Sequence, residues 1–161
     1  MAKKSPPKNG EGHKIITNNR KASFLYTLSE KFEAGMVLVG SEVKSLRDGR
    51  ANLSDSYVDT RHGELYLFNA HISPYTAANL FNHEPLRPRK LLLHAQEVEK
   101  LLGRMRERGF TVVPTRMYFK NGRAKCEIAL AKGKKLHDKR ESIKRKEQER
   151  VISRTLREGR R

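Results

Sequence analysis

The large apolar side chains of this chain lie almost entirely between residues 15 and 131. The 30 residues from 132 to 161 contain only five of them, namely Leu136, Ile143, Val151, Ile152 and Leu156. Burying five side chains does not offset the conformational entropy lost when thirty residues become ordered. We therefore predict one folded unit in the middle segment and a tail, residues 132–161, that does not fold alone.

Charge follows the same division. The whole sequence has 35 Lys and Arg against 18 Asp and Glu, a formal net charge of +17, and the tail has 13 basic and 5 acidic residues. Residues 1–14 contain four lysines and one glutamate among several Pro and Gly residues, which is typical of a flexible basic arm. A chain this basic is expected to bind a polyanion.

Several classes of protein are excluded by simple features. No apolar run approaches the ~18 residues of a membrane span, and none follows the basic N-terminus as in a secretory signal. We therefore predict a cytoplasmic protein without a membrane partner. The single cysteine, Cys126, excludes an intramolecular disulfide and a cysteine-built zinc site. The six histidines show no metal-ligand spacing, so we expect loop or surface histidines, no metal and no cofactor.

The middle segment has mostly strand patterns. Apolar residues alternate from Phe24 to Leu28, and the run from 36 to 46 is rich in Val and Leu. Hairpin turns are predicted at 61–64 and, more strongly, at Asn121-Gly122, because Asn-Gly between two apolar runs favours a tight turn. Three prolines indicate a loop from about 73 to 89.

One helix is predicted near 98–105, where apolar residues repeat at helical spacing before Gly109. Together the patterns predict a mainly β fold over residues 15–131. We expect a small closed antiparallel barrel, of which the OB type is one example, with one or more peripheral helices. An open α+β sheet is the alternative.

No catalytic residues are predicted. Ser41 and Lys44 match the spacing of a serine–lysine nucleophile pair, but Ser5 and Lys8 do so as well, and the companion motifs are absent. The carboxylates are spread along the chain and mostly neighbour basic residues. We therefore expect a binding protein.

The basic residues form separate groups. Residues 104–108 are interpreted as a solvated helix face, whereas 87–90 hold three cations beside two prolines and predict a rigid, exposed basic loop suited to phosphate contacts. Lys44 and Arg47 lie in a strand-like run, so they face opposite sides unless a bulge or turn intervenes. The tail begins with five cations in nine residues around His137, whose ring can stack on a base. Spaced apolar residues favour a tail helix that forms on its target, and a nonspecific basic tail is the alternative.

Four runs match one family in order and spacing. They are GSEVKSLR at 40–47, RKLLL at 89–93, AKGKK at 131–135 and DKR at 138–140. From about Asn19 onward, the sequence resembles the small protein B family, the bacterial tmRNA-binding proteins of trans-translation. The resemblance implies an OB-type barrel and a disordered basic tail that becomes helical on the ribosome.

The resemblance also implies a function. Such a protein is a non-enzymatic adaptor that binds the tRNA-like domain of tmRNA (SsrA RNA) and promotes its delivery to stalled ribosomes, for rescue and for peptide tagging. The implied partners are tmRNA, elongation factor Tu, alanyl-tRNA synthetase and the stalled 70S ribosome with its 16S rRNA, decoding centre and empty mRNA channel. Alternatives are a ribosome assembly factor and, from another class, an RNA-processing nuclease with a metal-binding carboxylate cluster.

The resemblance assigns site residues in two sets. The residues implied to bind tmRNA are Glu33, Leu92 and Lys125, with Asn19, Arg20, Arg89 and Lys90 as supporting contacts. Glu33 is expected to accept a hydrogen bond from a base or a 2′-hydroxyl, and a structural salt bridge is its alternative role. The tail residues implied to bind the ribosome are Lys132, Lys134, Lys135, His137, Asp138, Lys139, Arg140, Ile152 and Leu156.

Overall fold

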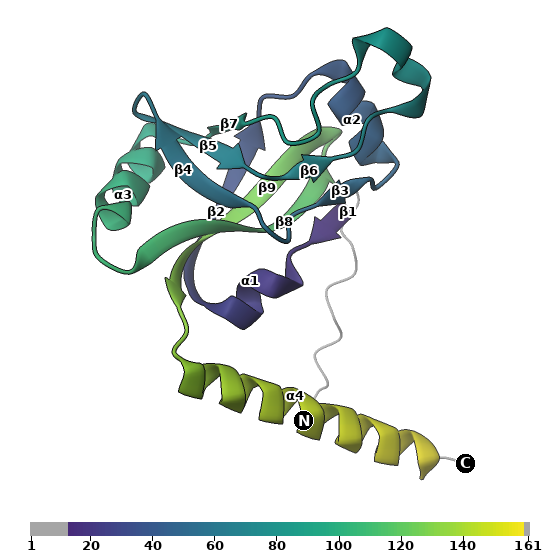
Figure 1. Cartoon of the computed structure of the whole chain (residues 1–161), viewed down its shortest axis with the longest axis vertical. Coiled ribbons are helices and arrows are strands. Elements are labelled where there is room, and N and C mark those ends of the chain that lie inside the picture. The colour runs from purple at the N-terminus through teal and green to yellow at the C-terminus, as the bar shows by residue number, and fades with distance from the viewer. Residues whose placement is uncertain (1–12, 160–161) are drawn as a thin grey trace.

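The computed structural model describes residues 13–159, so most of the predicted basic arm lies outside the described residues (Figure 1). The strands are β1 (His13–Asn18), β2 (Tyr26–Met36), β3 (Ala51–Asn52), β4 (Tyr57–Arg61), β5 (Glu64–Phe68), β6 (His71–Ile72), β7 (Arg89–Leu92), β8 (Phe110–Lys120) and β9 (Arg123–Gly133). The α-helices are α1 (Arg20–Leu25), α2 (Gly40–Arg47), α3 (Ala95–Met105) and α4 (Leu136–Glu158), and a 3₁₀ helix spans Thr76–Phe81.

Seven strands form one sheet in the order β1-β8-β4-β5-β7-β2-β9, and β9 also pairs with β8. The antiparallel pairings therefore return to their starting strand, and six strands form a ring from β8 through β4, β5, β7, β2 and β9. The weakest link in this ring is the β4–β8 pairing, which rests on Val58 opposite Val112. A mainly β fold with several helices is thus confirmed. The short strands β3 and β6 form a separate pair.

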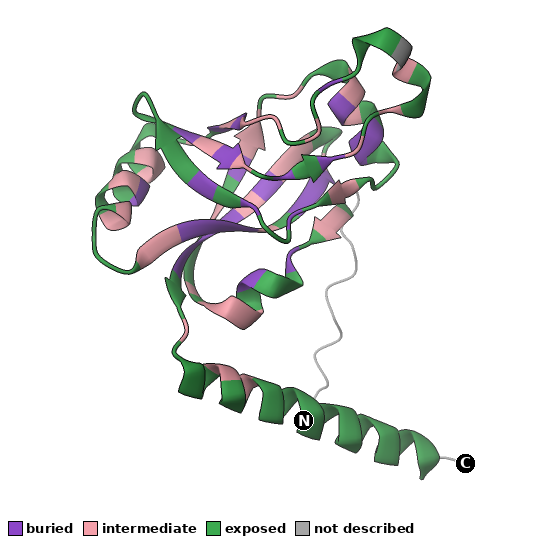
Figure 2. Ribbon diagram, in the orientation of Figure 1, coloured by how far each residue is buried: buried purple, intermediate pink, exposed green. Residues whose placement is uncertain are grey.

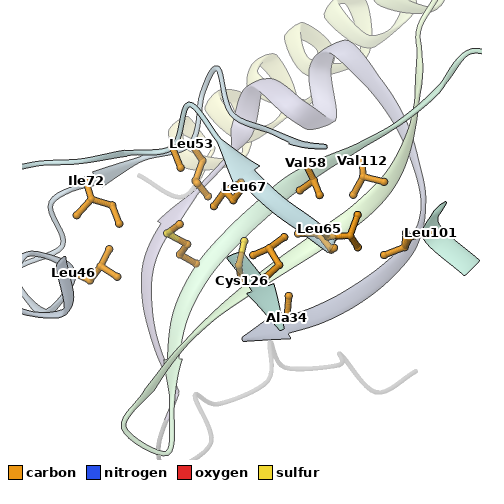
Figure 3. Close-up of a cluster of buried hydrophobic side chains, with 14 of the residues drawn as sticks. Ala34, Leu46, Leu53, Val58, Leu65, Leu67, Ile72, Leu101, Val112 and Cys126 are labelled. Carbon is orange, nitrogen blue, oxygen red and sulfur yellow. The ribbon is translucent and has the colours of Figure 1, made fainter. Parts of the chain in front are cut away.

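The hydrophobic core lies within the ring of paired strands. Buried side chains come from every strand of the ring, from Leu101 of α3 and from Leu46 of α2. Figure 3 shows part of this cluster. Cys126 is fully buried in this cluster, and burial raises the pKa of its thiol to about 12. Because α2 and α3 each contribute a buried leucine, both helices are fixed to the sheet that they cover.

Both predicted hairpins are confirmed, and so is the predicted helix. His62 and Gly63 have φ of 53° and 75°, and Asn121 and Gly122 have φ of 51° and 75°. Positive φ at both central residues is what a type I′ hairpin turn requires. Helix α3 begins where Glu97 accepts a hydrogen bond from the His94 amide at 3.0 Å.

Two segments predicted as strands are partly helical: the pattern at 24–28 is correct for Tyr26–Leu28, which begin β2, but Phe24 and Leu25 end α1, and most of the run from 36 to 46 forms α2. Residues 20–25 form α1 because the Asn19 side chain accepts a hydrogen bond from the Ala22 amide at 3.1 Å and so caps the helix. Residues 40–47 form α2, whose first turn is capped by the Glu42 carboxylate, 2.9 Å from the Val39 amide. Lys44 and Arg47 are exposed and share one face of α2, contrary to the strand interpretation.

The tail contains one long helix, α4, which has no buried residue (Figure 2). Its N-terminus is capped by Asp138, whose carboxylate accepts a hydrogen bond from the Lys135 amide at 3.3 Å. The predicted boundaries differ by two residues at each end: His13 and Lys14 belong to β1, and Lys132 and Gly133 belong to β9. That the helix forms only on its target stays a prediction. Between residues 13 and 159, no helix combines the length and the apolar character that a bilayer span requires.

Candidate nucleic-acid interface

An open groove of about 350 Å³ lies over the adjacent ends of β7, β2 and β9, beside α2. Gly35 of β2 is at its centre, paired with Leu92 of β7 on one side and with Lys125 of β9 on the other. Leu92 is 50% exposed, an unusual fraction for a leucine in a sheet. The structure therefore brings two of the predicted tmRNA-binding residues, Leu92 and Lys125, to the same groove. We refer to it below as the Leu92 groove; its lining residues are Gly35, Met36, Leu38, Val43, Leu92, Gly122, Arg123, Ala124 and Lys125.

The absence of a side chain at Gly35 shapes this groove. A Cβ atom built there would lie 3.3 Å from the Leu92 Cβ, which is closer than ordinary van der Waals contact. A larger residue at position 35 would therefore push Leu92 out of its present position. Glycine lets the leucine side chain lie across β2, with its outer face open to solvent.

Glu33, the third predicted tmRNA-binding residue, lies two positions before Gly35 on β2. The Tyr118 hydroxyl donates a hydrogen bond to its carboxylate at 2.5 Å, and Lys120 donates from 3.2 Å. The bond from Tyr118 lowers the pKa of Glu33; burial opposes this effect, and the charges of Lys120 and Lys125 reinforce it. Glu33 is thus an ionised carboxylate held by its neighbours. Its side chain is still 37% exposed, so the groups that fix Glu33 also present it at the surface.

Tyr118 and Lys120 were not predicted as site residues. Tyr118 pairs with Lys125 across the β8–β9 hairpin, which places its hydroxyl next to the groove. Burial and the neighbouring Glu33 carboxylate both raise the pKa of Tyr118, so it stays a neutral donor. The registers of the β2–β9 and β8–β9 pairings together bring Tyr118 close to Glu33, and local sequence patterns do not contain these registers.

The predicted exposed basic loop at 87–90 is wrong. Arg89 is fully buried in β7, and its Nε donates to Glu42 at 2.8 Å, while its other nitrogens donate to the carbonyls of Ala70 and Pro85. Arg87 donates to the same carboxylate at 2.7 Å. The prediction failed because the partner of both arginines, Glu42, is more than forty residues away in the sequence. Arg89 consequently has no exposed surface with which to contact a phosphate.

This buried ion network fixes α2 to β7. Burial alone would raise the pKa of Glu42, but the hydrogen bonds from Arg87 and the Val39 amide, together with the charge of Arg89, hold it below its usual value. Since Val43 of α2 lines the Leu92 groove, the Glu42 network also sets the position of one groove wall.

Two further polar residues of the tmRNA set, Lys90 and Asn19, have partners within the chain. Lys90 makes an ion pair with Glu64 at 2.6 Å, with its side chain 36% exposed. Asn19 is buried, and its amide nitrogen donates to the carbonyls of Leu53 at 3.0 Å and Pro114 at 2.9 Å, in addition to capping α1. The side chain of Asn19 thus holds α1 against the sheet.

Arg20 lies in a different place from the Leu92 groove. It lines a second cleft, between α1 and α4, with cations of the tail helix. Helix α4 is attached here through Lys134, whose amide donates to the Leu25 carbonyl at 3.0 Å and whose Nζ donates to the Ser23 carbonyl at 2.9 Å.

The other predicted tail residues are mostly exposed. Lys132 lies over the Phe110 ring, 5.6 Å from its centroid, and His137 lies 3.8 Å from Glu141. Ile152 and Leu156 share one face of α4 and are 59% and 66% exposed. The cations Lys135, Lys139 and Arg140 make no ion pair with a carboxylate within residues 13–159.

The histidines were predicted to lie in loops or at the surface, and His83 is a loop residue that is nevertheless buried. His83 is buried; its Nδ1 lies 2.9 Å from the Ser41 hydroxyl and its Nε2 lies 2.9 Å from the Ile72 carbonyl. It therefore holds the 73–88 loop against α2. In the part of the chain that the structure describes, no three His, Cys, Asp or Glu side chains gather as metal ligands would.

The fold and the site together define a class, small and strongly basic β proteins with an open, partly apolar groove and a cationic helical extension. The profile of the SmpB protein family matches residues 16–158, and the chain belongs to this family. It is 58% identical over 147 residues to the SsrA-binding protein of Geobacter sulfurreducens, covering 91% of this chain and 96% of that protein. It is 56% identical over 158 residues to the SsrA-binding protein of Syntrophobacter fumaroxidans, covering 98% of each.

The comparison with a solved structure supports the same family. A chain from the work described as "tmRNA-SmpB: a journey to the center of the bacterial ribosome" is 45% identical, with a TM-score of 0.64. The match covers 74% of this chain and 85% of the solved one. The family implied by the sequence resemblance is therefore confirmed.

Proposed function

We propose that this chain is an RNA-binding adaptor, without catalysis, that binds the tRNA-like domain of tmRNA through the Leu92 groove. The observation that carries this proposal is the convergence of Glu33, Leu92 and Lys125 around Gly35. Three strands supply these residues, and no pair of them is closer than thirty positions in the sequence. Relatives named SsrA-binding protein cover nearly the whole chain, which supports the choice of RNA.

The Leu92 groove, together with Glu33 and Lys120 beside it, offers three kinds of contact that suit a folded RNA. Lys125 and Lys120 supply cations for phosphate oxygens, which position the RNA without reading its sequence. The exposed face of Leu92 packs against a base or a ribose. Glu33, fixed by Tyr118, accepts a hydrogen bond from a base amino group or a 2′-hydroxyl, a contact that a cation cannot make. Arg89, being buried, acts indirectly by holding Glu42 and α2.

The proposal extends to the fold and the tail. The ring of six paired strands supports a closed OB-type barrel, the fold that the family resemblance implies. Helix α4 and the cations that precede it occupy the empty mRNA channel of a stalled 70S ribosome, where His137 stacks near the decoding centre. A channel that still holds mRNA excludes the helix, which selects stalled ribosomes. Elongation factor Tu and alanyl-tRNA synthetase act on the same tmRNA, and the proposed location is the cytoplasm.

Binding of the isolated tRNA-like domain RNA tests this proposal. We expect Lys125→Ala to weaken binding about three- to tenfold and to lower the dependence of log K on log salt concentration by about 1, because one phosphate contact is lost. Leu92→Ala should weaken binding without changing the salt dependence. Arg61→Ala removes an exposed cation outside the groove and is the matched control. Equal losses in Lys125→Ala and Arg61→Ala would contradict a groove-centred interface.

A further inference from the structure

The 73–88 loop presents two large apolar side chains to solvent. Leu80 and Phe81, the last two residues of the 3₁₀ helix, are 94% and 89% exposed, more than any other large apolar side chain between residues 13 and 159. Figure 1 shows this loop, between β6 and β7, projecting past α2 at the end of the molecule opposite α4. We refer to Leu80 and Phe81 as the loop tip. Two adjacent apolar side chains with this exposure indicate a contact site for another molecule.

Hydrogen bonds at the base of the loop hold the tip in place. The Tyr75 amide donates to the side-chain oxygen of Asn82 at 2.9 Å, and the side-chain nitrogen of Asn82 donates to the Tyr75 carbonyl at 2.8 Å. One residue therefore closes the 3₁₀ helix across both of its ends. His83 adds its contacts to the Ser41 hydroxyl and the Ile72 carbonyl. The tip is thus carried by a fixed loop, which reduces the conformational entropy lost when a partner binds.

The charge of the surrounding sequence indicates the class of partner. Residues 62–86 contain neither Lys nor Arg, the longest such run in a sequence with 35 of these residues. A surface that binds nucleic acid needs cations for the phosphates, and this loop supplies none. The centre of a protein–protein interface is instead depleted in charged residues and enriched in aromatic ones. The loop tip therefore fits an apolar pocket of a folded protein better than it fits RNA.

One cation lies at the edge of this surface. The Lys44 Nζ of α2 lies 5.6 Å from the centroid of the Tyr75 ring, at the base of the loop. Lys44 makes no ion pair with a carboxylate between residues 13 and 159. A partner that covers the tip can therefore place a carboxylate beside Lys44, which adds a charge contact at the rim of an apolar interface.

We infer that the loop tip docks into an apolar pocket of a ribosomal protein, with a carboxylate at the rim of that pocket for Lys44. The inference rests on the proposed function, because it needs the chain to be on the ribosome. With α4 in the mRNA channel, the tip lies at the opposite end of the molecule and reaches a separate part of the ribosome. Neither tip residue lines the Leu92 groove, so tmRNA and the ribosomal protein use different surfaces.

Photocrosslinking from the tip tests the inference. Phe81 is replaced by p-benzoylphenylalanine, and the full chain is irradiated on stalled 70S ribosomes together with tmRNA. We expect an adduct with one ribosomal protein, which proteases destroy and ribonucleases do not. The same replacement at Tyr57, a 40% exposed aromatic residue of β4, is the matched control and should not give this adduct. An adduct with ribosomal RNA or tmRNA in place of protein, or the same protein adduct from both positions, would overturn the inference.

Affinity measurements show whether the contact contributes to binding. Leu80→Ser/Phe81→Ser should weaken binding to stalled 70S ribosomes by about fivefold or more, and Lys44→Gln by about two- to threefold. Because both tip side chains are almost fully exposed, the double variant should keep the urea midpoint of the native chain. Leu86→Ser changes a 48% exposed leucine of the same loop and is the matched control, with an expected change of less than about twofold. Equal losses in the tip and control variants would overturn the inference.

Binding of the isolated tRNA-like domain separates this inference from the proposed function. Leu80→Ser/Phe81→Ser should bind that RNA as tightly as the native chain does, because the tip lies outside the Leu92 groove. Weaker binding of the RNA would overturn the inference, since the tip would then contact tmRNA. Failure of the native chain to bind stalled ribosomes would instead contradict the proposed function, and the inference with it.

Discussion

Each strand of the six-strand ring contributes at least one buried side chain to the core, whereas the 23 residues of α4 contribute none. The two regions also differ in how their cations are paired with carboxylates. In the body of the chain (residues 13–133), carboxylates such as Glu33, Glu42 and Glu127 hold nearby cations in ion pairs. On α4, the cations Lys146, Arg150, Arg154 and Arg157 make no such ion pair with any residue between 13 and 159. The comparison shows that the number of cations in a sequence does not distinguish cations that stabilise the fold through ion pairs from cations that are available to bind another molecule.

Removing the tail tests this division most severely. Truncation after Gly133 keeps β9 complete and deletes α4, so binding of the tRNA-like domain should stay largely intact while peptide tagging on stalled ribosomes is abolished. Tagging in a reconstituted translation system, together with RNA binding by the same protein, measures both outcomes. Loss of both activities together would show that the body and α4 do not act separately.

A single substitution in the buried ion network should have the largest effect on stability. Glu42→Gln leaves Arg87 and Arg89 without a counter-charge, and we expect the free energy of unfolding to fall by about 3–5 kcal/mol. Urea denaturation followed by circular dichroism measures this change. Glu141→Gln, an exposed carboxylate of α4, is the matched control and should change stability by less than about 0.5 kcal/mol. Similar losses of unfolding free energy in Glu42→Gln and Glu141→Gln would contradict the contrast between the body of the chain and α4.

A comparison of the native chain with Glu42→Gln also gives a pH prediction. Burial alone would raise the pKa of Glu42, but its hydrogen bonds and the charge of Arg89 keep it below the usual value of 4.5. A carboxyl group with a lowered pKa stabilises the fold at pH values above 4.5 and loses this contribution as the pH falls through the lowered pKa. The difference in unfolding free energy between the native chain and Glu42→Gln should be constant from about pH 6 to 8 and shrink in acid. A difference that grows on acidification would contradict the lowered pKa.

A smaller effect is expected at the groove. Gly35→Ala places a Cβ 3.3 Å from the Leu92 Cβ, so Leu92 must shift by a few tenths of an ångström. We expect binding of the tRNA-like domain to weaken a few-fold, as measured by anisotropy of the labelled RNA. Gly103→Ala, on α3 with open space around it, is the control and should leave this binding unchanged.

How well the sequence predicts a feature depends on how far apart in the sequence the interacting residues lie. Asn121-Gly122 and the α3 repeat are local patterns, and both predictions hold. Helices α1 and α2 were missed because their apolar residues were assigned to strands, although Asn19 before α1 and Glu42 in the first turn of α2 are capping residues that the sequence does contain.

The site residues divide in the same way, into those that the sequence indicated and those that depend on contacts between distant positions. Family resemblance assigned Glu33, Leu92 and Lys125, and the fold brings these three together. Arg89 was predicted to be exposed, because nothing near it in the sequence shows that Glu42 neutralises it. Tyr118 was missed for a similar reason: its contact with Glu33 joins residues 85 positions apart, and only the pairing of β2, β9 and β8 creates it.

The burial of Cys126 has a practical consequence for labelling. The chain's single thiol is enclosed in the core, and its raised pKa keeps it protonated at neutral pH, so maleimide reagents will not modify it in the native protein. Cysteines introduced at Ser23 and Ser153 would then be the only reactive positions in an otherwise unaltered background. A donor and an acceptor dye attached there would report the distance between α1 and the tail helix, one molecule at a time.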